Sequence, residues 1–228
     1  MTDAIPHDAP TNVPDIPHVT PRDKLMDAAT RLFCKHGINA TGIDAIVSEA
    51  GTAKTTLYKL FGSKNDLVEA VLQSEGRIWR DWFIAAIERA NTPRGKLDSI
   101  FPALKKWFGE ENYYGCVFIN AVGEHSKDET RLRALTLQHK SFIIAHIEGL
   151  AREAGAGKPD FLAHQIGILM DGAIVAAMVT REPSVADAAG NAAKALLDEA
   201  CGRPARKSGR SATRRPASRP RRENLTVG

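Results

Sequence analysis

Residues 41–66 read Thr-Gly-Ile-Asp-Ala-Ile-Val-Ser-Glu-Ala-Gly-Thr-Ala-Lys-Thr-Thr-Leu-Tyr-Lys-Leu-Phe-Gly-Ser-Lys-Asn-Asp, and this stretch decides the fold. Its first half has apolar residues at helical spacing, Ile43, Ile46 and Val47. Gly51 follows where a residue of positive φ can end one helix and turn the chain. The inward face of a second helix is then formed by Leu57, Leu60 and Phe61. The stretch therefore predicts two short helices joined by a tight turn.

The outer face of the second predicted helix carries hydroxyls, one aromatic ring and two lysines, without a carboxylate: Thr52, Lys54, Thr55, Thr56, Tyr58 and Lys59. Such a face suits phosphates and base edges. A bare helix-glycine-helix pattern is more often an ordinary hairpin, but the flanks favour a helix-turn-helix. Residues 22–36 have the helical period of a covering helix, and Ser63 with Asp66 signals the start of another. We expect the second helix to enter a DNA major groove.

From about Pro21 to Val71 the sequence resembles the TetR-type transcriptional repressors. The matching features are Leu-Phe-x-x-x-Gly at the end of the first helix and the run from Ala50 to Leu67. One departure is Leu60, where the family often has histidine, and we expect this side chain to lie toward the hairpin interior.

This resemblance and the polar outer face together define the expected contacts with double-stranded DNA. Base and phosphate contacts are expected from Lys54, Thr55, Thr56 and Tyr58, phosphate contacts from Lys59 and Lys64, and backbone positioning from Thr41 and Thr52. The expected DNA-binding set also includes Arg22 and Ala53.

Charge divides the chain into four parts. Residues 1–19 contain three aspartates, four prolines and no Lys or Arg, which predicts a disordered acidic leader in a cytoplasmic protein rather than a secretory signal. The predicted DNA-binding domain, residues 20–66, has a net charge of +2, whereas residues 67–200 sum to −3. Residues 202–228 form a predicted disordered basic tail, which either adds sequence-independent DNA affinity or has no specific role. The net charge of +4 therefore comes from the tail.

Several other classes of function are disfavoured. No apolar run approaches the ~18 residues of a membrane helix, so no membrane partner is expected. The cysteines at 34, 116 and 201 contain no Cys-x-x-Cys pair, and buried inert thiols are favoured over redox-sensing ones. His125, His139, His146 and His164 do not form a convincing ligand set, so we expect neither a metal nor a cofactor. No catalytic motif is present, and a Cys116–His125 pair has no geometric support, so an enzyme is not expected.

The remaining sequence predicts helices and no convincing run of strands. The expected helices cover residues 63–90, 93–108 with a break at Pro102, 127–154, 159–181 and 185–200. Residues 113–125 are predicted to form a short buried helix, with a strand as the alternative. The fold class is therefore all-α, with an N-terminal three-helix DNA-binding head and a C-terminal helical ligand-binding and dimerisation trunk spanning residues 67–201.

Most aromatic side chains fall in one stretch of the trunk with polar groups beside them, as in a ligand pocket or an ordinary core. The resemblance favours a pocket for a small apolar or aromatic inducer. The candidate lining residues are Trp79, Trp82, Phe83, Trp107, Phe108, Tyr113, Tyr114, Phe118, Asn120, Glu124 and His125.

The last two predicted helices are rich in small residues, which permits either close packing within the chain or a two-fold interface. The resemblance implies that these helices form a homodimer interface. The residues expected there are Gly167, Met170, Ala173, Ile174, Ala177, Ala189, Ala192 and Leu196.

Together these patterns favour a ligand-responsive, DNA-binding repressor that recognises a palindromic operator as a homodimer. The alternative is a helical small-molecule binding or carrier protein whose hairpin does not bind DNA.

Overall fold

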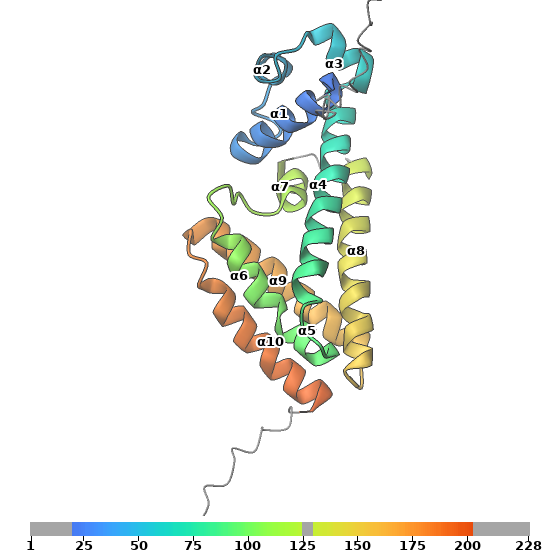
Figure 1. Cartoon of the computed structure of the whole chain (residues 1–228), viewed down its shortest axis with the longest axis vertical. Coiled ribbons are helices and arrows are strands. Elements are labelled where there is room, and N and C mark those ends of the chain that lie inside the picture. The colour runs from blue at the N-terminus through green and yellow to red at the C-terminus, as the bar shows by residue number, and fades with distance from the viewer. Residues whose placement is uncertain (1–19, 125–129, 203–228) are drawn as a thin grey trace, which may run out of the picture.

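The computed structural model describes residues 20–124 and 130–202, and within these ranges every regular element is a helix. A small head at the N-terminal end is joined by one long helix to a larger trunk (Figure 1). The all-α class and the N-terminal helix-turn-helix head are thus confirmed. The predicted leader, the basic tail beyond Gly202 and His125 lie outside the described residues.

The head consists of α1 (Pro21–His36), α2 (Ile43–Glu49) and α3 (Lys54–Phe61). The hydroxyl of Thr20 accepts a hydrogen bond from the amide of Asp23, whose carboxylate accepts one from the amide of Thr20, so α1 begins in a capping box. Gly51, with φ 59°, turns the chain between α2 and α3 as expected. Leu25, Ile46 and Leu57, one from each helix, are completely buried.

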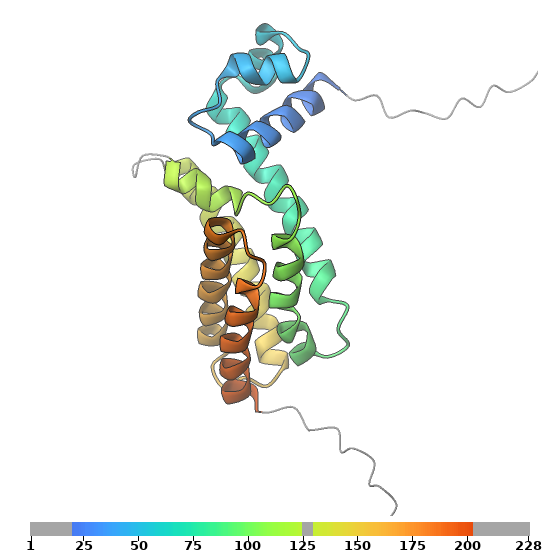
Figure 2. The same cartoon turned by 90° about the vertical axis from the view of Figure 1, so that its left-hand side faces the viewer.

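The helix α4 (Lys64–Ile87) runs from the head into the trunk (Figures 1 and 2). Ser63 caps it by accepting a hydrogen bond of 3.1 Å from the amide of Asp66. The proposed boundary between the two domains, after residue 66, falls in the first turn of α4. The helix α4 packs on α1 and α3 in the head and on α6, α7 and α8 in the trunk.

The trunk adds six more helices in the described ranges: α5 (Pro93–Asp98), α6 (Ile100–Phe108), α7 (Val117–Glu124), α8 (Thr130–Glu153), α9 (Pro159–Thr180) and α10 (Val185–Cys201). The prediction of a short buried helix is confirmed by α7, and the strand alternative is wrong. The predicted start of α8 at residue 127 lies outside the described part of the chain.

The break expected at Pro102 occurs three residues earlier, at Ser99, between α5 and α6. Pro102 lies in the first turn of α6, where the missing amide hydrogen costs no intrahelical bond and no preceding turn clashes with the ring. The prediction was therefore correct about the interruption and wrong about the residue.

Two glycines allow close contacts within the trunk. A β-carbon at Gly167 of α9 would lie 2.4 Å from Ile144 Cδ1 of α8, and one at Gly190 of α10 would lie 3.0 Å from Phe101 Cβ of α6. Normal van der Waals contact requires more space than either distance provides. These small residues therefore serve packing within one chain.

The helix α9 is the most apolar long helix, with a mean hydropathy of 1.6 over an 18-residue window of which 44% is buried. By length and composition alone it resembles a membrane-crossing helix, but a core helix has the same properties. It packs against α6, α8 and α10. Its buried face belongs to the trunk core, and its outer face remains exposed and apolar.

Replacement of Gly190 by valine is expected to lower the free energy of unfolding by about 1–3 kcal/mol, because the new side chain would overlap Phe101. Urea denaturation at fixed protein concentration measures the change. Gly149→Val in α8 is the control, because no atom lies within 4 Å of a β-carbon built there. Equal effects at the two positions would contradict the close contact between α6 and α10.

Candidate functional site

The outer face of α3 is the candidate nucleic-acid interface. Lys54, Thr55, Tyr58 and Lys59 are exposed, Thr56 is half-buried, and Ala53 is the exposed residue that precedes the helix. The helix therefore presents hydroxyl, phenol and ammonium groups on one surface, as the sequence predicts. Such groups can bond both phosphate oxygens and base edges.

Leu60 is also part of this outer surface, which corrects the expectation that it faces the hairpin interior. Its side chain is 41% exposed, whereas Leu57 is completely buried. The helix is anchored by Leu57, and Phe61 is only half-buried. An exposed leucine on this face suits an apolar contact such as a thymine methyl group.

A carboxylate of α2 lies beside the outer face of α3. Asp44 forms an exposed ion pair of 3.0 Å with Lys54 Nζ. The hydrogen bond and charge of Asp44 raise the pKa of Lys54. The pair orients the lysine, and a phosphate that binds Lys54 would compete with Asp44.

Three residues of the predicted DNA-binding set have structural partners. Thr41 is 3% exposed, and its hydroxyl donates to the carbonyl of Gly37 at 2.7 Å. Lys64 Nζ donates to the carbonyl of Ile38 at 2.7 Å. The guanidinium of Arg22 lies 5.2 Å from the ring centroid of Phe61, which ties α1 to the end of α3. Thr41 is therefore a buried structural residue and not the surface contact that the sequence suggested.

Thr52 precedes α3 and has a different environment. Its hydroxyl oxygen is buried and has no hydrogen-bond partner among the residues that the structure describes.

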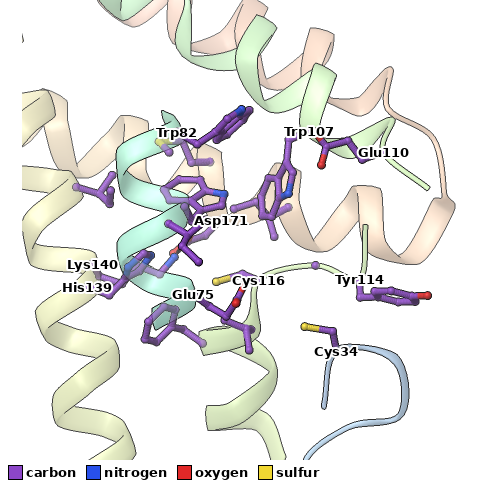
Figure 3. A pocket seen from close by; sticks show the side chains of 18 of the residues that line it. Cys34, Glu75, Trp82, Trp107, Glu110, Tyr114, Cys116, His139, Lys140 and Asp171 are labelled. Carbon is purple, nitrogen blue, oxygen red and sulfur yellow. Dashed lines mark hydrogen bonds and ion pairs between the residues drawn. The ribbon is translucent and has the colours of Figure 1, made fainter. Parts of the chain in front are cut away.

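The second candidate site is a cavity of about 730 Å³ between the head and the trunk. Its walls come from α1, α4, α6, α7, α8, α9 and the segment before α7 (Figure 3). Five of the predicted residues line it: Trp79, Trp82, Trp107, Tyr114 and Phe118.

Five other predicted residues do not line the cavity: Phe83, Phe108, Tyr113, Asn120 and Glu124. Phe83 is completely buried behind Trp79, with ring centroids 4.9 Å apart. The hydroxyl of Tyr113 donates to the carbonyl of Ile174 at 2.7 Å, so this residue joins the trunk core. Core packing accounts for these aromatics, which periodicity alone does not distinguish from pocket walls.

Asn120 and Glu124 lie on α7 and bond to the chain itself. The amide of Asn120 donates to the carbonyl of Tyr114 at 3.1 Å. Glu124 accepts a bond of 2.8 Å from the backbone amide of Asn39, in the turn between α1 and α2. Glu124 therefore connects α7 to the head rather than to the cavity.

The aromatic wall of the cavity is formed mainly by three indoles. The ring centroid of Trp79 lies 6.1 Å from that of Trp82 and 5.5 Å from that of Trp107. The indole nitrogen of Trp79 is buried and has no acceptor within the described ranges.

Sequence reasoning missed the polar residues of the cavity. α1 contributes Thr30 and Cys34, α4 contributes Glu75, and α8 and α9 contribute Lys140 and Asp171. A signal for Glu75 was present, because it falls in the apolar stripe of Val68, Val71, Leu72 and Trp79 along α4. No comparable signal indicated that α1 would form part of the wall.

The titratable groups of the cavity have distinct environments. Burial raises the pKa of Glu75, and a 3.5 Å hydrogen bond from the hydroxyl of Thr30 partly opposes this shift. Lys140 and Asp171 form an ion pair. Burial, aided by the nearby charges of Arg80 and Lys140, lowers the pKa of His139 to about 4, so this imidazole is neutral at pH 7.

The two cysteines that line the cavity are Cys34 and Cys116. Burial raises the pKa of Cys34 to about 11 and also raises the pKa of Cys116. A protonated thiol is a poor nucleophile. This environment agrees with inert thiols and disfavours the redox-sensing alternative.

The histidines on α8 face different neighbours. His139 stacks on Phe118 with ring centroids 4.1 Å apart, whereas His146 lies 3.6 Å from a carboxylate oxygen of Glu88.

Across residues 20–124 and 130–202, no group of three or more His, Cys, Asp or Glu residues is arranged to hold a metal ion.

The small residues predicted at a dimer interface require correction. Met170, Ala173, Ile174 and Ala177 are at most 4% exposed within one protomer, because this face of α9 packs into the trunk core. Gly167 packs against Ile144. Ala189 and Leu196 are half-buried, and only Ala192 is exposed.

The exposed face of the last two helices consists of other residues. On α9 it carries the large apolar side chains Phe161, Ile168, Val175 and Val179, and on α10 it carries Ala188, Ala192 and Ala195. The α9 residues recur at helical spacing and form one stripe, which we call the α9 stripe.

The structure has a three-helix head that contains a helix-turn-helix, and a shared helix joins this head to an all-α trunk with a cavity. These features define a helix-turn-helix protein with a separate site large enough for a small molecule. Residues 25–71 match the family model of bacterial regulatory proteins, tetR family. A crystal structure of a TetR-family transcriptional regulator from Streptomyces coelicolor has a TM-score of 0.75 at 26% identity, and the match covers 80% of this chain and 96% of that chain. The head therefore contains a TetR-type helix-turn-helix domain, and the fold of the described chain is similar to that of a TetR-family transcriptional regulator.

Two curated relatives match over shorter lengths. The chain is 33% identical over 96 residues to the HTH-type transcriptional repressor KstR2 of Mycolicibacterium smegmatis, a match that covers 40% of this chain. It is 40% identical over 80 residues to the HTH-type transcriptional regulator BetI of Agrobacterium fabrum, a match that covers 35% of this chain. The chain spans only 45% and 38%, respectively, of the length of these relatives.

Substitution of Thr41 by valine is expected to lower the free energy of unfolding by about 1–3 kcal/mol, because carbonyl groups of α1 and its C-terminal turn lose a buried donor. Thr55→Val on the exposed face of α3 should change it by less than about 0.5 kcal/mol. Urea denaturation followed by circular dichroism compares the two variants. Unchanged stability of the Thr41 variant would contradict its structural role.

Proposed function

We propose that the chain is a cytoplasmic transcriptional repressor that binds a palindromic operator as a homodimer and releases it when a small molecule fills the cavity. The observation that carries the proposal is the polar, lysine-bearing outer face of α3 in a helix-turn-helix head. The relatives named above are a repressor and a regulator of the helix-turn-helix type.

The outer face of α3 supports entry into a major groove. Its exposed polar side chains can donate hydrogen bonds and Leu60 offers an apolar contact, while Leu57 packs the opposite face into the head core. Lys59 is exposed and has no hydrogen bond or ion pair in the described part of the chain, so its ammonium group is free to bind phosphate. Lys64 reaches phosphate only by leaving the carbonyl of Ile38.

The α9 stripe supports dimerisation. Ile168 is 72% exposed and Val179 is 74% exposed, which is unusual for large aliphatic side chains at helical spacing. Two copies of α9 and α10 would bury these residues in a four-helix interface. In a two-fold dimer the two α3 helices could also enter successive major grooves, whose centres are about 34–36 Å apart on one face of the DNA.

The position of the cavity supports a link between ligand and head. Thr30 and Cys34 of α1 form part of its wall, and Phe118 and Cys116 at the start of α7 form another part. The other end of α7 bonds to Asn39 through Glu124. A ligand that prefers one arrangement of α1 and α7 would therefore shift the head relative to the trunk.

The alternative function is a carrier protein that does not bind DNA. The two functions are separated by fluorescence anisotropy with labelled DNA from the region upstream of the gene, against a random duplex of equal length. A repressor binds the upstream fragment in preference, whereas a carrier protein binds neither.

Lys59→Ala is expected to weaken binding to all DNA sequences by about threefold to tenfold. The slope of the logarithm of the binding constant against the logarithm of the salt concentration should fall by about the contribution of one phosphate contact. Thr55→Ala is expected to change the preference among sequences instead. Anisotropy titrations at several salt concentrations measure both effects. Lys105→Ala, on the trunk helix α6, is the control, and an equal loss there would contradict the proposed surface.

The double substitution Val175→Glu and Val179→Glu is expected to convert the dimer to a monomer, because two buried carboxylates per protomer would be left unpaired. Sedimentation velocity at micromolar concentration measures the change, and affinity for the upstream DNA should fall at least about tenfold. Ala85→Glu on the exposed side of α4 is the charge control. A wild-type protein that sediments as a monomer would contradict the dimer.

A further inference from the structure

The cavity contains a carboxylate whose charge is not matched. Three carboxylates line the wall: Asp171 is paired with Lys140, and Glu110 is exposed to solvent. Glu75 is half-buried, and its only hydrogen bond within the described ranges comes from the hydroxyl of Thr30 at 3.5 Å. Thus the carboxylate of Glu75 lacks a cationic partner in this part of the chain.

The lysine and arginine side chains that line the cavity bond to other groups or are exposed to solvent. Arg31 bonds to Glu49 at 3.1 Å, and Lys140 bonds to Asp171. Lys35 is exposed on α1. His139 is neutral at pH 7, because burial lowers its pKa to about 4. None of these groups neutralises Glu75 through a direct contact.

Aromatic rings surround the same side of the cavity. Glu75, Trp79 and Trp82 follow one another at intervals of four and three residues, so they lie on one face of α4. Trp107 of α6 packs edge-on against Trp79 with ring centroids 5.5 Å apart. Figure 3 shows Glu75, Trp82 and Trp107 around the same space. Indole faces attract cations, and tryptophan attracts them most strongly of the aromatic residues.

From these contacts we propose that the cavity selects flat, lipophilic cations and that Glu75 is the residue that selects their charge. The inference rests on the ligand cavity of the proposed function and specifies its ligand. A delocalised cation loses less hydration energy than an ammonium ion when it enters an apolar cavity. It would stack among the indoles while its charge meets Glu75, and this carboxylate would then gain the partner that it lacks.

The direct test is isothermal titration calorimetry of the full chain with three probes of similar shape and different charge. N-methylacridinium is the cation, acridine at mildly alkaline pH is the neutral probe, and anthracene carboxylate is the anion. The cation is expected to bind at least about tenfold more tightly than acridine, which corresponds to about 1.4 kcal/mol. The anion should bind most weakly.

Glu75→Gln keeps the size of the side chain and removes the charge. It should bring the affinities of the cation and acridine to within about twofold of each other, whereas Glu110→Gln, at the exposed part of the wall, should keep the full preference. Circular dichroism checks that each variant is folded. The probe series on the wild-type chain remains decisive if Glu75→Gln does not fold.

Three results would overturn the proposal. The first is binding of acridine or anthracene carboxylate as tight as that of the cation, the second is an unchanged preference in folded Glu75→Gln, and the third is failure of all three probes to bind. These titrations contain no DNA. A chain that fails to bind its upstream DNA would therefore contradict the regulatory function while leaving the charge preference measurable.

Discussion

The structure depends on the continuity of α4, which supplies apolar side chains to both the head and the trunk. Leu67 and Val71, near its beginning, pack into the head, whereas Phe83 and Ile87, near its end, pack into the trunk. A helix of 24 residues is ~36 Å long and resists bending along its axis. A displacement of the trunk end of α4 as a rigid body would therefore carry the head with it. The serine cap and the ion pairs from Arg131 to Asp66 and Glu69 hold its first turns in place.

The cavity lies where this shared helix leaves the head, and this position explains its mixed composition. Most apolar side chains come from α4 and the trunk helices, whereas polar side chains come from α1, from Glu75 of α4 and from Lys140 and Asp171 of the trunk. Gly76 contributes to the same junction, because a β-carbon there would lie 2.7 Å from the ring of Phe118. Phe118 thus approaches the backbone of α4 closely and forms part of the cavity wall. The head, α4 and α7 meet at this one place.

The spacing of apolar residues predicted where the helices lie in the sequence, but it did not predict which neighbouring element covers each face of a helix. The apolar spacing fixed the limits of α1, α4 and α9 to within about three residues, since a buried stripe must recur at every turn. It did not separate Met170 and Ile174, which pack within the protomer, from Ile168 and Val175, which face outward, because α9 is apolar all round. Similarly, three tryptophans line the cavity while Phe83 and Tyr113 fill the core behind them. Which neighbour covers a given face depends on contacts far apart in the sequence.

The three tryptophans of the chain, Trp79, Trp82 and Trp107, all line the cavity, and the head contains none. The tryptophan fluorescence of the protein therefore originates from the cavity walls. A molecule that enters the cavity replaces the medium around these indoles, whereas DNA bound at α3 does not touch them. Under the proposed function, tryptophan fluorescence would thus report on occupancy of the cavity while DNA is present.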